Sequence, residues 1–179
     1  MFYQPQIDLR TGGIIAAEAL VRWRHPQRGL MLPEEFLPAA MDTGLIKAID
    51  EWVLRTVCRH SQAWQQCGKM PLRISMNISN SLFHGNTLLS VVKESLSQTG
   101  LTPACLELEL TESIVMHNVD ASIAALTTLK AMGVPLSIDD FGTGYSSLSY
   151  LQRLPIDRGK IDQSLGLIKF RVKESRQIK

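Results

Sequence analysis

Two adjacent aspartates, Asp139 and Asp140, end a short apolar stretch and lead directly into a turn that contains Gly142 and Gly144. Neighbouring carboxylates repel each other, so a fold that places them at the end of a half-buried strand needs a cation or a group of hydrogen-bond donors nearby. A divalent metal ion commonly meets this need. The two glycines permit a tight loop but are weak evidence for phosphate binding. The aspartate pair therefore predicts a metal site.

Further oxygen donors lie near the carboxyl ends of successive predicted strands, at Glu18, Asn77, Glu109 and Glu112. Mg2+ and Mn2+ prefer carboxylate, amide and water ligands to thiolate or imidazole. If the strand ends converge, one such ion would be bound by Glu18, Asn77, Glu109 and Asp139. Asp140 would supply a second metal position, and two metals about 3.5–4 Å apart can activate a water for phosphodiester cleavage. Lys160, late in the next strand, would orient that water or offset charge on the phosphate.

Each of these residues also has an ordinary structural explanation when it is taken alone. An isolated glutamate at a strand end is most often solvated, Glu112 with Ser113 would cap a following helix, and Asn77 would satisfy the backbone of a turn. Their occurrence at the same end of consecutive strands favours a site. Arg22 shares the strand parity of Glu18 and is predicted to clamp a phosphate, because guanidinium pairs with phosphate through two hydrogen bonds.

Strand-like and helical stretches alternate along the chain with short turns between them. Apolar or alternating runs predict strands near the amino terminus and at 14–23, 72–79, 106–112, 135–140 and 158–162. Helical spacing predicts a helix that begins at Pro33, helices at 45–66, 88–96 and 119–132, and a short helical turn at 146–151. This alternation favours an α/β fold with a mainly parallel sheet.

Ligands drawn from many strands favour a TIM-type (β/α)8 barrel, in which the loops at the carboxyl ends of the strands build the site. A doubly wound open sheet is the alternative, although it usually binds its ligand at one switch point. A closed barrel needs eight strands and we count about six, so we predict an incomplete barrel.

Core packing explains Trp52, Trp64 and Met70. No metal-ligand spacing links the histidines, which are His25, His60, His84 and His117.

The composition is that of one ordinary globular domain. A chain of 179 residues can bury a core without disulfides, and its three cysteines have no disulfide or zinc spacing, so we expect reduced cytosolic thiols. The net charge is +2, but basic residues gather at 169–179, where we expect a solvated tail. No stretch approaches the ~18 apolar residues of a spanning helix. We predict a cytoplasmic segment without membrane contact, in a parent protein that could itself be membrane-anchored.

The chain closely resembles the EAL family, which hydrolyses the bacterial second messenger cyclic di-GMP. The family is named after the tripeptide that stands here as Glu18-Ala19-Leu20. Further matches follow the family's order and spacing at Tyr3-Gln4-Pro5, Pro33-Glu34-Glu35-Phe36, Thr43-Gly44-Leu45-Ile46, Asn77-Ile78-Ser79, Glu109-Leu110-Thr111-Glu112, Asp139-Asp140-Phe141-Gly142-Thr143-Gly144 and Lys160-Ile161-Asp162. The tripeptide alone would occur by chance in many proteins, whereas the set of motifs spans most of the chain.

The resemblance implies a modified TIM-type barrel that uses Mg2+ or Mn2+ to hydrolyse cyclic di-GMP to linear pGpG. The resemblance also implies that one metal is bound by Glu18, Asn77, Glu109 and Asp139. Asp140 would take part in the second metal position. Lys160 matches the lysine associated with the attacking water. Glu112 matches the glutamate that holds the loop beginning at the aspartate pair, a loop linked to metal binding and dimerisation. Gln4 and Arg22 match positions that contact the dinucleotide.

The chain departs from the family pattern at both ends. Family members usually carry a helix before the first strand, whereas Met1 stands almost directly before the predicted strand here. We find no counterpart of the family's carboxyl-terminal third, with two strands and a further catalytic glutamate. Gly159 stands where the family has a leucine. We therefore expect a partial EAL domain at 1–165 and a divergent basic tail at 166–179. We interpret the chain as a truncated or frameshifted product, or as an excerpt of a longer protein.

Three functional hypotheses follow. The first is a cyclic di-GMP phosphodiesterase whose catalysis is impaired by truncation. The second is a non-catalytic module that binds cyclic di-GMP or a partner protein, and the third is a remnant without function. The expected partners are cyclic di-GMP and a second copy of the chain in a homodimer, and no nucleic acid polymer is expected.

Overall fold

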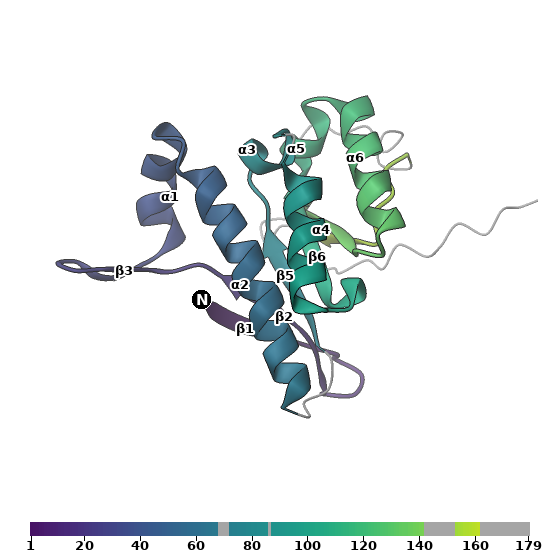
Figure 1. The fold of residues 1–179 in the computed structure, drawn as a ribbon, viewed down its shortest axis with the longest axis horizontal. Helices are drawn as coiled ribbons and strands as arrows, with labels where there is room; N and C mark the ends of the chain where they lie inside the picture. The colour runs from purple at the N-terminus through teal and green to yellow at the C-terminus, as the bar shows by residue number, and fades with distance from the viewer. Residues whose placement is uncertain (68–71, 86, 142–152, 162–179) are drawn as a thin grey trace, which may run out of the picture.

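The centre of the fold is a six-stranded sheet that curls into a half-barrel (Figure 1). The computed structural model of the protein describes residues 1–67, 72–85, 87–141 and 153–161. Across the sheet the strands are β1 (Phe2–Ile7), β2 (Ile14–Leu20), β5 (Arg73–Asn77), β6 (Leu106–Thr111), β7 (Leu136–Phe141) and β8 (Arg158–Ile161). Strand β1 is antiparallel to β2, and the other neighbouring pairs are parallel. The predicted incomplete TIM-type barrel is confirmed.

Helices cover one face of the sheet (Figure 1). The longer ones on this face are α2 (Ile46–Gln66), α4 (Leu88–Thr99) and α6 (Val119–Ala131), while α1 (Pro33–Asp42) lies beside α2 and away from the sheet (Figure 1). Short turns of helix follow or precede strands at α3 (Asn80–Phe83), η1 (Pro103–Cys105) and α5 (Glu112–Met116). Because the connections between parallel strands cross over through these helices, the carboxyl ends of the strands gather at one edge of the sheet.

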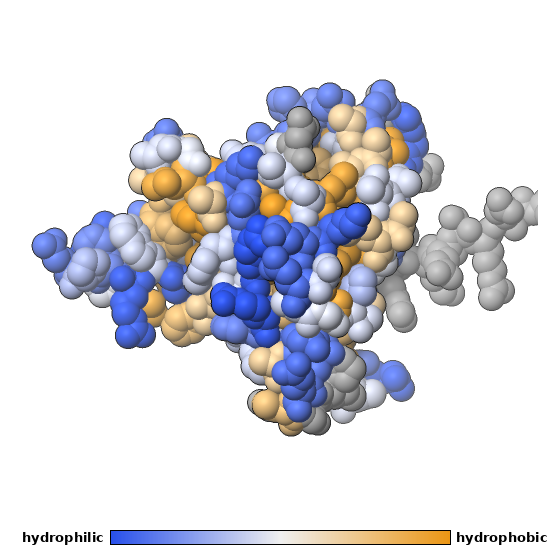
Figure 2. All heavy atoms as spheres, in the orientation of Figure 1, coloured by the Kyte–Doolittle hydropathy of each residue, from blue (hydrophilic) through white to orange (hydrophobic). Residues whose placement is uncertain are grey.

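The hydrophobic core lies between the sheet and its helices. The strand side chains that point toward the helices are at most 1% exposed: Ile74, Met76, Leu106, Leu108, Leu110, Leu136 and Ile138. Helices α2, α4 and α6 bury Leu54, Val57, Val92, Leu126 and Leu129 in the same core. Burial of each large apolar side chain stabilises the fold by about 1.5–3 kcal/mol. The outer surface of this helical layer is largely hydrophilic over α2, as Figure 2 shows.

Alternate residues of the same strands point to the inside of the half-barrel, and these are polar. Parallel pairing aligns Ser75 with Glu107 and Asn77 with Glu109, while the next pair aligns Glu109 with Ser137. A side-chain period of two places residues of equal parity on one face. The predicted site residues Glu18, Asn77, Glu109, Asp139 and Lys160 therefore share the inner face of the sheet.

The region 14–23 differs from the prediction of a single strand. Strand β2 ends at Leu20, and Trp23 begins a separate hairpin of β3 (Trp23–His25) and β4 (Gly29–Met31). The hairpin projects from the body of the molecule in Figure 1. Its turn is closed by His25 Nδ1, which accepts hydrogen bonds from the backbone N–H groups that follow it. The chain thus leaves the barrel sheet immediately after the tripeptide at 18–20.

The predicted helices at 33 onward, 45–66, 88–96 and 119–132 are confirmed with small shifts in their ends. The core assignment of Trp52 was wrong, because its side chain is 49% exposed on α2 while its neighbour Val53 points into the core. Trp64 is partly buried and packs against the core. Met70, the helical turn at 146–151 and the tail at 166–179 lie outside the described residues.

In the described part of the chain, each helix is too short or too polar to cross a bilayer.

Candidate active site

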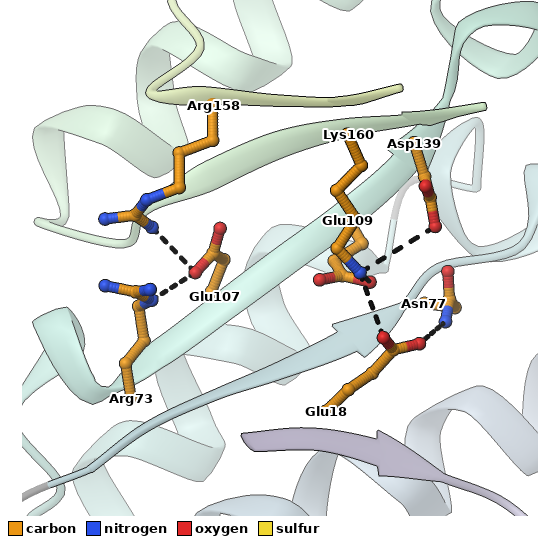
Figure 3. Close-up of polar contacts among 8 residues, drawn as sticks. All are labelled: Glu18, Arg73, Asn77, Glu107, Glu109, Asp139, Arg158 and Lys160. Atoms are coloured by element: carbon orange, nitrogen blue, oxygen red, sulfur yellow. Dashed lines mark hydrogen bonds and ion pairs between the residues drawn. The ribbon is translucent and has the colours of Figure 1, made fainter. Parts of the chain in front are cut away.

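The side chain of Lys160 lies at the centre of the polar inner face. Its Nζ donates a hydrogen bond of 2.5 Å to Glu109 Oε2 and one of 3.0 Å to Glu18 Oε2, and it lies 3.8 Å from Asp139 Oδ2 (Figure 3). These four residues come from β8, β6, β2 and β7. The fold therefore brings together carboxylates that are far apart in the sequence and binds them to one ammonium group.

Asn77 completes this group from β5. Its Nδ2 donates a hydrogen bond of 3.1 Å to Glu18 Oε1. The two carboxylate oxygens of Glu18 therefore have different partners, since Oε2 binds Lys160 and Oε1 binds the amide. The structure places Glu18, Asn77, Glu109, Asp139 and Lys160 in one cluster, as the sequence predicted.

Burial sets the electrostatics of the cluster. The side chain of Glu109 is 0% exposed and that of Lys160 is 27% exposed. Burial opposes a charge on Lys160, but the carboxylates of Glu109, Glu18 and Asp139 outweigh it and raise the pKa of the ammonium above its ordinary value. Burial also raises the pKa of the Glu109 carboxyl, an effect that the adjacent Lys160 opposes. The ammonium is thus held in its charged form as a hydrogen-bond donor.

The oxygen donors of the cluster fit a hard divalent cation. Three carboxylates face one ammonium, so the cluster retains negative charge that such a cation would offset. The buried Glu109 Oε1 makes no hydrogen bond within the described ranges, which leaves one carboxylate oxygen with unused acceptor capacity. Across those ranges no three His, Cys, Asp or Glu side chains are arranged to hold a metal as they stand. Three of the expected ligand side chains instead contact Lys160.

Of the two predicted dinucleotide contacts, Gln4 lies opposite Glu18 in the sheet and Arg22 lies just beyond the end of β2. Gln4 is the Cα partner of Glu18 in the β1–β2 ladder, and such pairs point to the same face of a sheet. Arg22 follows β2 and donates a hydrogen bond of 2.8 Å from Nη1 to Val21 O. Its guanidinium carbon lies 6.0 Å from the centre of the Phe2 ring, at the distance of a weak cation–π contact. Phe2 is a neighbour of the site that the sequence reasoning missed.

Glu112 is the first residue of α5 and is 5% exposed. It follows β6 directly, so it lies close to the strand that carries Glu109. Residues 142–144 of the loop that it is predicted to hold, which begins at Asp139, lie outside the described residues. The side chain of Asp140 also lies outside them, and its predicted metal contact remains a prediction.

A second charged cluster lies one layer below the first and was not predicted. Glu107, which is 3% exposed, pairs with Arg73 of β5 and with Arg158 of β8 (Figure 3). The Arg158 Nη1 to Glu107 Oε2 distance is 2.8 Å. Glu107 and Arg158 lie two residues before Glu109 and Lys160 on the same strands. The sequence shows that Glu107 has the same strand parity as Glu109, and Arg158 the same as Lys160. Which of these side chains form ion pairs depends on the order of the strands in the sheet.

Fold and site together define a TIM-type barrel domain with a carboxylate and lysine cluster at the carboxyl ends of its strands. Residues 1–177 match the EAL domain family, and the chain belongs to that family. It is 46% identical over 164 residues to cyclic di-GMP phosphodiesterase NbdA of Pseudomonas aeruginosa, a match that covers 92% of this chain and 21% of NbdA.

A second relative from Pseudomonas aeruginosa is the bifunctional diguanylate cyclase/cyclic di-GMP phosphodiesterase MucR. It is 48% identical over 163 residues, which is 91% of this chain and 24% of MucR. The solved structure of the MucR phosphodiesterase in complex with c-di-GMP superposes with a TM-score of 0.87 and covers 90% of this chain and 66% of that chain. The chain therefore spans about a quarter or less of the length of these curated relatives.

Proposed function

We propose that this chain hydrolyses cyclic di-GMP to linear pGpG with a divalent metal, Mg2+ or Mn2+, and that its catalysis is impaired, so that its rate is lower than that of the MucR phosphodiesterase domain. Membership of the EAL family and the names of its relatives support the substrate. The observation that carries the proposal is the convergence of Glu18 and Glu109 on Lys160 Nζ, at 3.0 and 2.5 Å. A family resemblance in sequence alone would not require these three side chains to meet.

Each residue of the cluster has a proposed part. Asp140 belongs to a second metal position, and the first ion would be held by Glu18, Asn77, Glu109 and Asp139. The bound metal would supply an activated water and stabilise the leaving oxygen of the phosphodiester. Lys160 already donates hydrogen bonds to carboxylate oxygens, and it would donate in the same way to the attacking water or to a phosphate oxygen.

We also propose substrate-binding roles for Arg22 and Gln4 and a supporting role for Glu112. Arg22 would bind a phosphate oxygen through its guanidinium, and Gln4 would hydrogen-bond the dinucleotide from the neighbouring strand. Glu112 would hold the loop that begins at the aspartate pair. We further propose a partial EAL domain at 1–165, a divergent tail at 166–179, a homodimer and a cytoplasmic location.

The proposal is tested by product analysis. The purified chain is incubated with cyclic di-GMP and Mg2+ or Mn2+, and nucleotides are separated by chromatography, with the MucR phosphodiesterase domain as the positive control. We expect linear pGpG from the wild-type chain and none from Glu109→Gln, which keeps the side-chain volume but loses a charged oxygen donor. Arg153→Gln, an exposed residue outside the cluster, serves as the matched control and should leave the rate unchanged.

One result would contradict hydrolysis. Absence of linear product with both metals, where the MucR domain works, removes the catalytic claim for this chain. Calorimetric titration then separates the other two hypotheses, because binding of cyclic di-GMP without turnover would identify a non-catalytic binding module. No binding heat and no cooperative unfolding transition would identify a remnant.

A further inference from the structure

Asp50 is a buried carboxylate on α2 that lies outside the polar cluster. It is 7% exposed, and its Oδ2 accepts a hydrogen bond of 3.0 Å from the backbone N–H of Ser79. Burial raises the pKa of Asp50 above its ordinary value, and the hydrogen bonding with Ser79 opposes this shift. An ionised carboxylate is costly to bury unless it makes specific hydrogen bonds. Because burial of the Asp50 carboxylate costs free energy, we expect its hydrogen bond with Ser79 to have a structural role.

Ser79 lies two residues after Asn77, in the segment that leaves β5. Its Oγ accepts a hydrogen bond of 3.3 Å from Leu82 N and caps the short helix α3. Between them, Ile78 N donates a hydrogen bond of 2.9 Å to Glu109 O. The segment is thus attached to β6 at Ile78, and to both α2 and α3 at Ser79. Two of these attachments come from elements that are distant in sequence.

Asn77 itself has less support than its neighbours. Its side chain is exposed at the end of the strand, and within the described part of the chain its amide group makes one hydrogen bond, from Nδ2 to Glu18 Oε1. The direction of this side chain therefore depends on the backbone at 77–79. A shift of that backbone would move the amide away from Glu18 and Glu109 together.

We propose that Asp50 is a positioning residue for the divalent-metal site, holding Ser79 N–H and thereby fixing Asn77 beside Glu18 and Glu109. The inference rests on the proposed function in one respect, which is that Asn77 binds metal. Groups that orient the direct ligands of a metal typically change its affinity about 10–100-fold when they are removed. Asp50 would act through its hydrogen bonding with Ser79 and not through its charge.

The test uses two substitutions that separate the hydrogen bond from the charge. Asp50→Asn keeps an oxygen that can accept from Ser79 N–H but is neutral, whereas Asp50→Ala removes the acceptor. Val57→Ala, a fully buried core change on the same helix, is the control for loss of stability. Mn2+ affinity is measured by calorimetry for each folded chain, and the side-chain NH2 resonances of Asn77 are recorded by NMR without metal.

We expect Asp50→Ala to weaken Mn2+ binding about 10–100-fold and to shift the Asn77 NH2 resonances. Asp50→Asn should stay within about threefold of the wild-type affinity, and Val57→Ala should bind as the wild type does. Equal losses for Asp50→Asn and Asp50→Ala would overturn the proposal, because charge would then be responsible. An equal loss for Val57→Ala would overturn it in favour of general destabilisation.

The two measurements distinguish this inference from the proposed function. If the wild-type chain binds no Mn2+, metal ligation in the proposed function fails, and the claim that Asp50 serves a metal site fails with it. The NMR result then stands alone. A shift of the Asn77 resonances in Asp50→Ala but not in Asp50→Asn still supports positioning of Asn77, and unchanged resonances in both overturn it.

Discussion

Lys160 Nζ lies 2.5 Å from Glu109 Oε2, and the Glu109 side chain is 0% exposed. This contact joins β8 to β6 across the intervening strand β7. It also places the only ammonium of the described cluster beside its most deeply buried carboxylate. The contact therefore contributes both to the stability of the half-barrel and to the chemistry proposed for it.

Replacement of Lys160 by methionine should destabilise the protein. Loss of one partner of a buried ion pair costs about 3–5 kcal/mol, and because Lys160 is 27% exposed we expect about 3 kcal/mol. The free energy of unfolding is measured in urea. Arg153→Met is the control, since Arg153 and Asp120 form a pair whose side chains are 57% and 89% exposed and should contribute little. Equal effects of the two substitutions would contradict a buried role for Lys160.

Replacement of Glu107 by glutamine should also destabilise the fold. The change removes the shared anion and leaves Arg73 and Arg158 facing each other without a counter-charge. We expect a loss of about 3 kcal/mol in the free energy of unfolding. Because Arg158 lies two residues before Lys160 on β8, the substitution should also reduce pGpG formation. Glu94→Gln, which disrupts the exposed pair with Arg55, is the control. Unchanged stability in Glu107→Gln would show that this lower cluster does not hold the strands together.

The stability of the protein should depend on Tyr3 at alkaline pH. Burial raises the pKa of Tyr3 to about 12, and its hydroxyl lies 2.7 Å from His60 Nδ1. The unfolded chain loses the phenolic proton near pH 10, whereas the folded chain keeps it to about pH 12. Between these values the folded state binds more protons, so the contribution of Tyr3 to stability falls as pH rises.

Urea unfolding of the wild type and of Tyr3→Phe from pH 8 to 11 measures this effect. The difference in unfolding free energy between the two proteins should be constant below about pH 10 and should then move in favour of the variant. A constant difference up to pH 11 would mean that Tyr3 ionises equally readily in the folded and unfolded chains.

Substitution of Gly159 by alanine should stabilise β8. A Cβ at this position meets no described atom within 4 Å, and the residue has no left-handed φ that would favour glycine. Glycine in the interior of a strand costs about 0.5–1 kcal/mol relative to alanine. We expect a gain of that size in urea unfolding, with Lys160 still in contact with Glu109. Gly133→Ala is the opposite control, since its φ of 83° is strained for other residues, and it should destabilise. A loss of stability in Gly159→Ala would contradict the conclusion that an added Cβ fits at this position without a clash.

Much of the site could be predicted because strand parity is visible in the sequence. Glu109 alternates with Leu108 and Leu110, and this alternation alone assigns it to the face opposite the helices. The order of parallel strands then brings the ends of β2, β5, β6 and β7 together. Prediction of the cluster needed only parity and a parallel sheet.

Other features depend on contacts that the sequence pattern does not contain. Arg22 to His25 continue the alternation of β2, so the break before the hairpin was not visible, and it is fixed instead by the pairing of β3 with β4. Trp52 and Val53 both fit helical spacing, yet the position of α2 on the sheet buries only Val53. The hydrogen bond between Asp50 and Ser79 joins a helix to a loop after a strand, and neither residue indicates the other.

The central claim is that Glu18, Asn77, Glu109 and Asp139 bind a divalent metal beside Lys160. Crystals of the chain grown with Mn2+ and measured at the manganese absorption edge test it most directly. We predict an anomalous peak bounded by oxygen atoms of these four residues, with Lys160 still at the site. An ordered cluster without an anomalous peak, in which Lys160 alone continues to pair with the three carboxylates, would contradict the account.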